Sequence, residues 1–184
     1  MRPLRTLGIA AGIVPWLLIS ASILLSPWFN PFNNALSDLG NTVLNSPVAY
    51  VFDIGLVISG LMAATFGAVL SARNPKAMFL CWSVPLTLGS VDLSLIGAFN
   101  ESMGRIHYIV SVIFFLLIII TMVVFGVVSF SLAAPLLGGV SLVLGLVSAL
   151  VWLIHWSWHG VAIQETFSAI AVAIILIMVA RRFA

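Results

Sequence analysis

Residues 106–130 read IHYIVSVIFFLLIIITMVVFGVVSF, a run of 25 residues that contains no Lys, Arg, Asp or Glu. A helix needs about 20 mostly apolar residues to cross a bilayer, so this run predicts a membrane span. Five further mostly apolar runs occupy residues 6–26, 48–72, 77–98, 135–155 and 160–180. Short alternating segments, which would predict a membrane β-barrel, are absent from the sequence. The expected fold class is therefore all-α, a polytopic bundle of six transmembrane helices forming a single domain over residues 1–184.

The composition and the distribution of charge support a membrane protein. Of the 184 residues, 62% are hydrophobic and 7% are charged, and the mean hydropathy is +1.26. If the chain alternates through six spans, six of its seven cations lie on one side and Arg105 lies on the other: Arg2, Arg5, Arg73, Lys76, Arg181 and Arg182. Cytoplasmic loops carry an excess of Lys and Arg, which predicts a multi-pass protein of the cell membrane with both termini in the cytoplasm. The pI near 9.2 reflects this bias, and we expect no nucleic-acid partner.

Several titratable residues lie near the outer ends of the expected spans. Counted from those ends, Asp53, Asp92, His107 and Glu165 all fall within about 10 Å of the outer boundary. A charge inside a bilayer costs free energy, so such side chains usually turn toward the bundle interior and often have a function. The cytoplasmic halves of the same helices carry mainly Leu, Ile, Val, Ala and Gly. The sequence therefore predicts one outward-facing polar pocket, lined by these four residues, above an apolar floor.

General acid–base chemistry is one use of this pocket. His107 could act as the base, while Glu165, Asp92 and Asp53 orient it or carry protons as further catalytic groups. Each residue also has a structural alternative. His107 can face lipid headgroups at a helix start, Glu165 can stabilise a helix N-terminus, and the two aspartates can pair within the bundle.

Zinc binding is a second possibility for the outer side. His155 and His159 are four residues apart and would share one helical face if the fifth span continued through residues 156–158. That spacing suits two ligands of one zinc ion, and His107 could be the third. The alternative is an interfacial histidine pair in a loop that is rich in tryptophan.

A long outer connection, residues 27–47, joins the first two spans. Its length is unusual for a helix–helix connection, and long ordered loops often form lids or binding segments. We therefore expect it to close over the pocket. The candidates for substrate binding are Asn34, Ser37 and Asp38 in this loop, together with Arg105 and Gln164.

Three stretches of the chain resemble an uncharacterised prokaryotic membrane family, domain of unknown function 998. Residues 34–40, NALSDLG, followed by a proline-initiated helix, resemble its most specific motif. Residues 104–115, GRIHYIVSVIFF, resemble its fourth-helix histidine motif, and Gln164-Glu165 resembles its last-helix glutamate. The resemblance covers the six-helix layout but includes neither His155 nor His159. It implies site roles for Ser37, Asp38, His107 and Glu165.

The Ser-Asp-Leu-Gly sequence at residues 37–40 is also similar, more distantly, to a loop of the damage-regulated autophagy modulator family. Relatives of that family act in membrane-lipid and GPI-anchor processing. The family resemblance implies a fold and leaves the reaction open.

Three functional hypotheses follow. The first is a small membrane-embedded enzyme that modifies a lipid or apolar substrate at the outer leaflet. The second is a proton- or cation-coupled transporter of small molecules, in which Asp53, Asp92 and Glu165 bind the ion. The third is a non-catalytic lipid-binding protein. Membrane lipid is the expected partner. The spacings Gly8-x-x-x-Gly12 and Ala63-x-x-x-Gly67 allow close helix packing, within the bundle or in a homo-oligomer.

Overall fold

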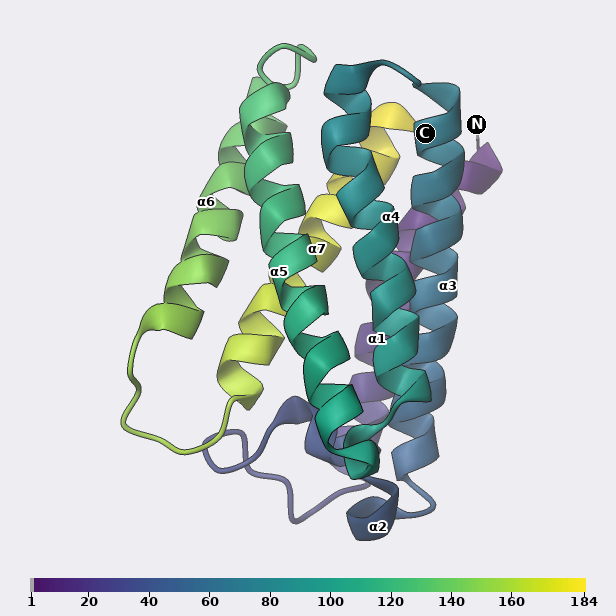
Figure 1. The fold of residues 1–184 in the computed structure, drawn as a ribbon. Helices are drawn as coiled ribbons and strands as arrows, with labels where there is room; N and C mark the ends of the chain where they lie inside the picture. Colours follow the sequence, from purple (N-terminus) through teal and green to yellow (C-terminus); the bar gives the residue numbers. More distant parts are fainter. Residues whose placement is uncertain (1) are drawn as a thin grey trace.

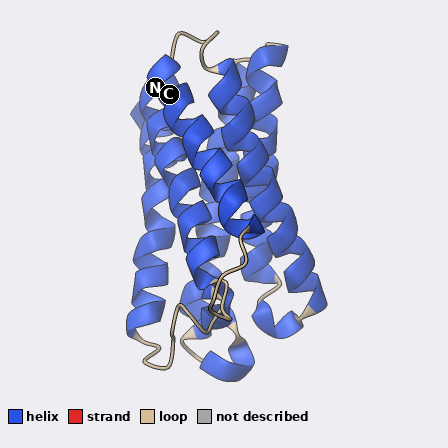
Figure 2. Cartoon of the chain, turned by 90° about the vertical axis from the view of Figure 1, so that its left-hand side faces the viewer, coloured by secondary structure: helices blue, strands red, loops and turns tan. Residues whose placement is uncertain are grey.

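The protein is a bundle of long helices in the computed structural model, which describes residues 2–184 (Figures 1 and 2). Six of its helices are long and apolar enough to cross a membrane: α1 (Arg2–Leu24), α3 (Ala49–Arg73), α4 (Ala77–Ala98), α5 (Arg105–Val128), α6 (Pro135–Leu153) and α7 (Ala162–Phe183). Three short helices complete the fold: η1 (Leu36–Gly40), α2 (Thr42–Asn45) and η2 (Glu101–Met103). Residues 2–184 contain no strand. The predicted all-α class with six spans is confirmed.

Both termini lie at the same end of the bundle, which we call the terminal end (Figure 1). The opposite end, which we call the loop end, holds three connections: residues 25–48, 99–104 and 154–161. This topology places six cations at the terminal end, as the alternating spans predict, and Arg105 at the loop end. Which end faces the cytoplasm remains a prediction from this charge bias.

Aromatic side chains fill the bundle near its terminal end. Trp82 of α4 is 1% exposed, and its ring centroid lies 4.6 Å from that of Phe79 and 4.7 Å from that of Phe125. Phe183 of α7 packs edge-on against Phe79 and Phe125. Large buried rings in mutual contact leave little room for water or a ligand. This half of the bundle is a closed apolar core.

The backbones of α5 and α6 approach each other closely toward the terminal end, and nearer the loop end the rings of Phe115 and Trp152 join the two helices. A Cβ at Gly126 would lie 2.7 Å from Leu142 Cβ, and one at Gly145 would lie 2.9 Å from Met122 Cβ. Ser141 Oγ also donates a hydrogen bond of 2.8 Å to the carbonyl of Met122. Toward the loop end the two helices diverge (Figure 1). The divergence makes room for a cavity there.

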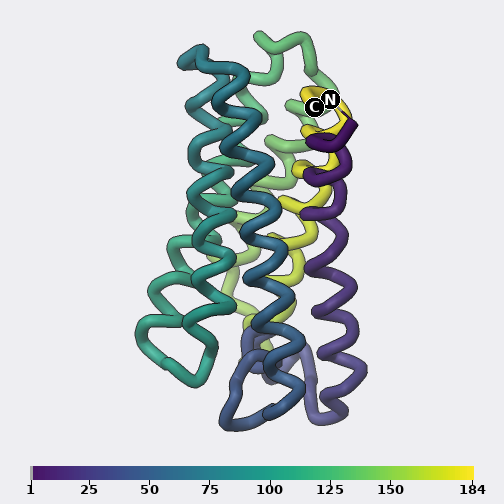
Figure 3. The backbone as a smooth tube through the Cα atoms, turned by 90° about the vertical axis from the view of Figure 1, so that its right-hand side faces the viewer, coloured from purple at the N-terminus to yellow at the C-terminus, as the bar shows by residue number. Residues whose placement is uncertain are grey.

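The small-residue spacings of α1 and α3 serve packing within the chain. Gly8 lies against Phe66 and Ala180, and Gly12 lies against α7. Gly67 lies against Thr87 of α4, which runs beside α3 over its whole length (Figure 3). The small residues of both spacings thus allow close contact between helices of the same chain. A homo-oligomer remains a prediction without their support.

The connection between α1 and α3, residues 25–48, is seated on the loop end, and we call it the lid. Backbone hydrogen bonds join it to the segment before α7: Gly160 N–H donates to Phe32 O at 2.8 Å, and Ala162 N–H donates to Asn34 O at 3.0 Å. Leu39 at its centre is 0% exposed. The lid is thus held in place by main-chain contacts and by buried apolar contacts.

Candidate functional site

Four side chains at the loop end, one of them from the lid, form a hydrogen-bonded group that we call the polar cluster: Ser37 of η1, Glu101 of η2, and His107 and Ser111 of α5. Ser37 Oγ donates to Glu101 Oε2 at 2.9 Å, and the same carboxylate oxygen lies 2.8 Å from His107 Nε2. Ser111 Oγ lies 3.2 Å from that nitrogen. The exposed fraction of the side chain is 6% for His107 and 29% for Glu101. The cluster joins three segments at one point near the loop end.

The hydrogen bonds of His107 define where its protons lie. Nδ1 is 2.7 Å from the carbonyl oxygen of Phe99, which can only accept, so Nδ1 carries a hydrogen. Nε2 faces the carboxylate of Glu101, and a contact of 2.8 Å between them requires a second proton. That proton lies on one partner or the other. The pair therefore holds a transferable proton between an acid and a base.

The charge state of Glu101 follows from its neighbours. Burial raises the pKa of its carboxyl group, but hydrogen bonds from His107 and Ser37 and the charge of His107 lower it, and the net result is a pKa below the ordinary value. The lowered pKa of the Glu101 carboxyl group favours the arrangement in which the shared proton is on the imidazole. In this form the cluster offers a proton acceptor and a proton donor side by side.

Glu165 lies in the first turn of α7 and is 7% exposed. Its carboxylate accepts a hydrogen bond from the backbone N–H of Leu36 in the lid. The preceding residue, Gln164, is also buried, and its Oε1 has no hydrogen-bond partner within the described residues. Glu165 therefore connects α7 to the lid beside the polar cluster.

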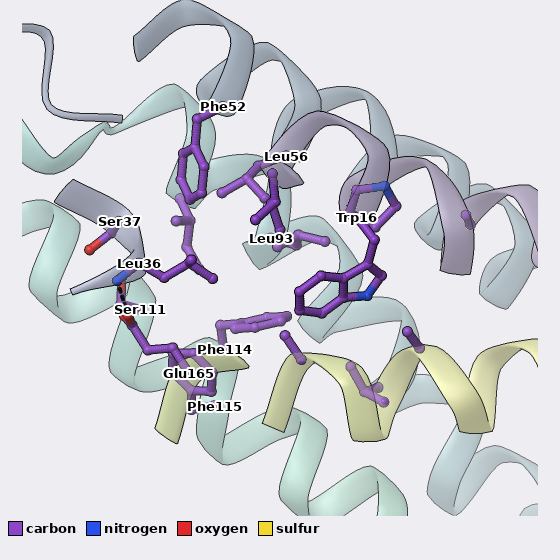
Figure 4. Close-up of a pocket in the computed structure, with 17 residues that line it drawn as sticks. Trp16, Leu36, Ser37, Phe52, Leu56, Leu93, Ser111, Phe114, Phe115 and Glu165 are labelled. Atoms are coloured by element: carbon purple, nitrogen blue, oxygen red, sulfur yellow. Dashed lines mark hydrogen bonds between the residues drawn. The ribbon is translucent and has the colours of Figure 1, made fainter. Parts of the chain in front are cut away.

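A large cavity of about 510 Å³ begins at these polar groups and extends between α5, α6 and the start of α7. Its walls are mainly apolar, with Val112 and Leu116 from α5 and Ala149 and Leu153 from α6. Ser37, Glu101, His107, Ser111 and Glu165 supply its polar end. A small cavity of about 90 Å³ lies among α1, α3, α4, α5 and α7 (Figure 4).

The structure brings some predicted site residues together and leaves others apart. His107, Glu165 and Ser37 line the large cavity. Asp38 instead binds within the lid, where its Oδ2 accepts from Asn34 Nδ2 and from Ala35 N–H, each at 3.0 Å. Arg105 is exposed at the start of α5. Asn34, Asp38 and Arg105, for which binding roles were predicted, therefore do not line the large cavity.

Asp53 and Asp92 lie outside both cavities. Asp53 is level with Gly97 of α4, because a Cβ on that glycine would meet the Asp53 carbonyl. Asp92 is five residues before Gly97, which places it about 7.5 Å farther from the loop end. Both still lie within about 10 Å of the loop-end termini of their helices, the depth expected from counting along the spans. Whether either aspartate has a catalytic role stays a prediction.

The spacing argument for zinc needs correction. Helix α6 ends at Leu153, so residues 154–161 do not continue it and His155 and His159 do not share a helical face. Within residues 2–184, no group of three or more His, Cys, Asp or Glu side chains is placed to hold a metal ion. The residues present thus do not fit the predicted three-histidine site, and zinc binding itself remains untested.

Sequence reasoning missed Glu101 and Ser111. Glu101 lies in a short connection outside the spans, so counting carboxylates within the spans overlooked it. Two signals pointed to them. Glu101 is the acidic residue of the connection that precedes the helix of His107. Ser111 follows His107 by four residues, so His107 and Ser111 share one face of α5.

Comparison with known proteins gives one match. A family model described as "Protein of unknown function (DUF998)" matches residues 9–182 of this chain, a range that includes the whole polar cluster. No curated protein and no solved structure shows significant similarity to the chain. The more distant similarity to the damage-regulated autophagy modulator family is not shown by these comparisons.

Proposed function

We propose that this chain, which belongs to the DUF998 family of proteins of unknown function, is a membrane enzyme that performs acid–base chemistry on the polar part of a lipid. The observation that carries the proposal is the hydrogen-bonded pair of Glu101 and His107 at the polar end of a large apolar cavity. Structural ion pairs inside a membrane protein need no adjoining cavity of this size. A catalytic pair does, because it must reach a substrate.

The cavity supports a lipid as the substrate. It lies between spanning helices, so its apolar walls are at the depth of lipid chains, and its polar end is near the membrane boundary. The charge bias of the loops suggests that this boundary is the outer face of the cell membrane. The chain would then act on the outer leaflet, with both termini in the cytoplasm.

The protonation of the pair suggests a division of labour. The Glu101 carboxylate would accept a proton from a hydroxyl group or a water molecule at the polar end of the cavity. His107, protonated at both ring nitrogens, would donate a proton to the departing group, while the Phe99 carbonyl fixes the orientation of its ring. Ser37 and Ser111 would position the pair through their hydrogen bonds.

Turnover of lipids by the purified protein in vesicles tests this proposal, with phospholipids labelled in the headgroup or in the chain as substrates. We expect His107→Ala and Glu101→Gln each to lower turnover by about 10²–10⁴-fold, the usual contribution of general acid–base catalysis. His155→Ala is the matched control, because His155 is an exposed loop histidine on the same side. Unchanged turnover in His107→Ala would overturn the enzyme proposal.

A proton- or cation-coupled transporter is a second candidate. It is supported by Asp53 and Asp92, each of which has a buried carboxyl oxygen without a hydrogen-bond partner in residues 2–184. Carboxylates of this kind inside a membrane often bind the coupling ion. Ion flux into liposomes that is abolished by Asp92→Asn, with lipid turnover absent, would favour this function. The closed aromatic core of the terminal half argues against an ion path through that region.

A further inference from the structure

The large and small cavities share four lining residues, which stand between them: Ser37, Ser111, Phe115 and Glu165. Two of these belong to the polar cluster, and Glu165 lies beside it. The polar groups thus stand between two apolar spaces.

The two cavities flank α7. The large cavity lies between α7, α5 and α6, where Trp152 bridges two helices through a hydrogen bond of 3.1 Å from its Nε1 to Ser168 Oγ. The small cavity lies between α7 and α1, with Ala169 and Trp16 in its walls. Figure 4 shows Trp16 and Phe114 directed into the small cavity, while Ser37, Ser111 and Glu165 gather at one end of it.

Both cavities also reach toward the membrane. Trp16, Ala169 and Ala173 in the small cavity are only half-buried, and Trp152 and Leu153 in the large cavity are exposed. Within a bilayer, exposed apolar side chains of spanning helices contact lipid chains. An acyl chain can therefore extend from either space into the surrounding membrane.

We propose that the site binds a double-chain lipid, with the linkage between its chains at the polar cluster, one chain in the large cavity and the start of the other chain in the small cavity. This inference rests on the proposed function and names its substrate class. It follows from the two apolar spaces on either side of the polar groups, because a molecule with one chain would occupy only one of them.

The volumes agree with two unequal branches. The large cavity of about 510 Å³ is more than five times as large as the small cavity of about 90 Å³. The large cavity can hold a whole chain. The small cavity can hold only the first part of a chain, and the remainder would run along the seam of α1 and α7.

Selectivity for two chains would come from filling space. A lipid chain that moves from the bilayer into an apolar cavity gains little from the hydrophobic effect, because both surroundings are apolar. A single-chain ligand, however, would leave the small cavity empty, and its wall atoms would lack partners for dispersion contacts. The second chain restores those contacts.

Binding measurements on the purified full chain in detergent test the inference. The probes are dioleoyl phosphatidylglycerol and dioleoyl phosphatidylethanolamine, each compared with its single-chain lyso form by titration in native mass spectrometry. Three substitutions of the same size distinguish the branches. Ala169→Phe fills the small cavity, Ala149→Phe fills the large cavity, and Ala68→Phe on the exposed face of α3 is the control.

We expect the unmodified protein to bind a double-chain probe on the order of tenfold more tightly than its lyso form, because an unfilled cavity of this size is costly. Ala169→Phe should remove this preference by weakening double-chain binding alone. Ala149→Phe should weaken both forms, and Ala68→Phe should change neither. If Ala169→Phe does not fold, Ala173→Leu in the same wall should give the same result.

Equal affinity for one and two chains with both headgroups would overturn the inference, and so would a folded Ala169→Phe protein that keeps its preference. These outcomes are separate from failure of the enzyme proposal. Intact preference for two chains without lipid turnover would contradict the enzyme and leave the double-chain site standing. Turnover of lyso and double-chain lipids at equal affinity would contradict only the double-chain site.

Discussion

The two halves of the bundle are built from the same helices but are packed differently. In the terminal half, Trp82, Phe125 and Met122 are at most 1% exposed and belong to one buried apolar cluster. In the loop half, the helices separate around two cavities and a group of polar side chains beneath the lid. The closed half therefore contributes most of the packing that stabilises the bundle. The open half packs less tightly and in exchange forms a site.

A change in side-chain size along α6 accounts for much of the difference. Gly138 and Gly145 bring its terminal half against α5. Toward the loop end α6 carries Ala149, Trp152 and Leu153, which line the large cavity, and the Trp152 ring contacts α5 at Phe115, with 4.8 Å between the ring centroids. Helix α6 therefore packs tightly against α5 at the terminal end and lines the large cavity at the loop end.

The largest expected effect is on the closed half. Trp82→Ala removes a 1% exposed ring from the aromatic core and should lower the free energy of unfolding by about 3–5 kcal/mol. Phe115→Ala, in a half-buried ring that lines both cavities, should cost clearly less. Unfolding by SDS titration in mixed micelles measures both. Equal losses for the two variants would contradict the contrast between the halves.

A smaller effect is expected where α5 and α6 touch. Gly145→Val places side-chain atoms against Met122 and Val123 and should destabilise the fold by about 1–3 kcal/mol through overpacking. Gly139→Val on the same helix is the control, because a Cβ there meets nothing within 4 Å. The control should lie within about 0.5 kcal/mol of the unmodified protein. Should both substitutions prove neutral, α6 would not be held by this contact.

The smallest effect concerns the open half and depends on pH. The pKa of Glu101 is lower in the folded protein than in the unfolded chain, so its ion pair contributes stability above the ordinary pKa of a glutamate. That contribution is lost as the pH falls through the lowered value. Because Glu101 is 29% exposed, we expect about 1 kcal/mol or less. Thermal unfolding at several pH values measures it.

The variant Glu101→Gln separates this contribution from general acid sensitivity. It should remove the Glu101-dependent part of the pH profile and leave the remainder unchanged, since other carboxyl groups still titrate. If the pH dependence of unfolding were the same in the variant, the ion pair with His107 would not stabilise the loop end.

The sequence predicted those parts of the structure that depend only on position along the chain. Spans follow from the length of apolar runs, and the positions of the cations follow from counting spans. His107, Glu165 and Ser37 were expected near one end for the same reason, and they come together there.

The remainder depends on three-dimensional packing. Counting depth says nothing about which face of a helix a residue occupies, and Asp53 and Asp92 lie at the expected depth but line neither cavity. Glu101 reaches His107 because η2 turns back over the first turn of α5. Helix α6 likewise ends at Leu153 without a proline or glycine at that point that would predict its end.

A density map of the protein in lipid nanodiscs tests the central claim, that the loop half holds a lipid site organised by Glu101 and His107, most directly. The account predicts chain density in the large cavity between α5 and α6, with a polar group of the lipid within hydrogen-bond distance of Glu101 or His107. Helix α6 packed against α5 along its whole length, with the cavity closed and lipid density confined to the outer surface, would contradict it.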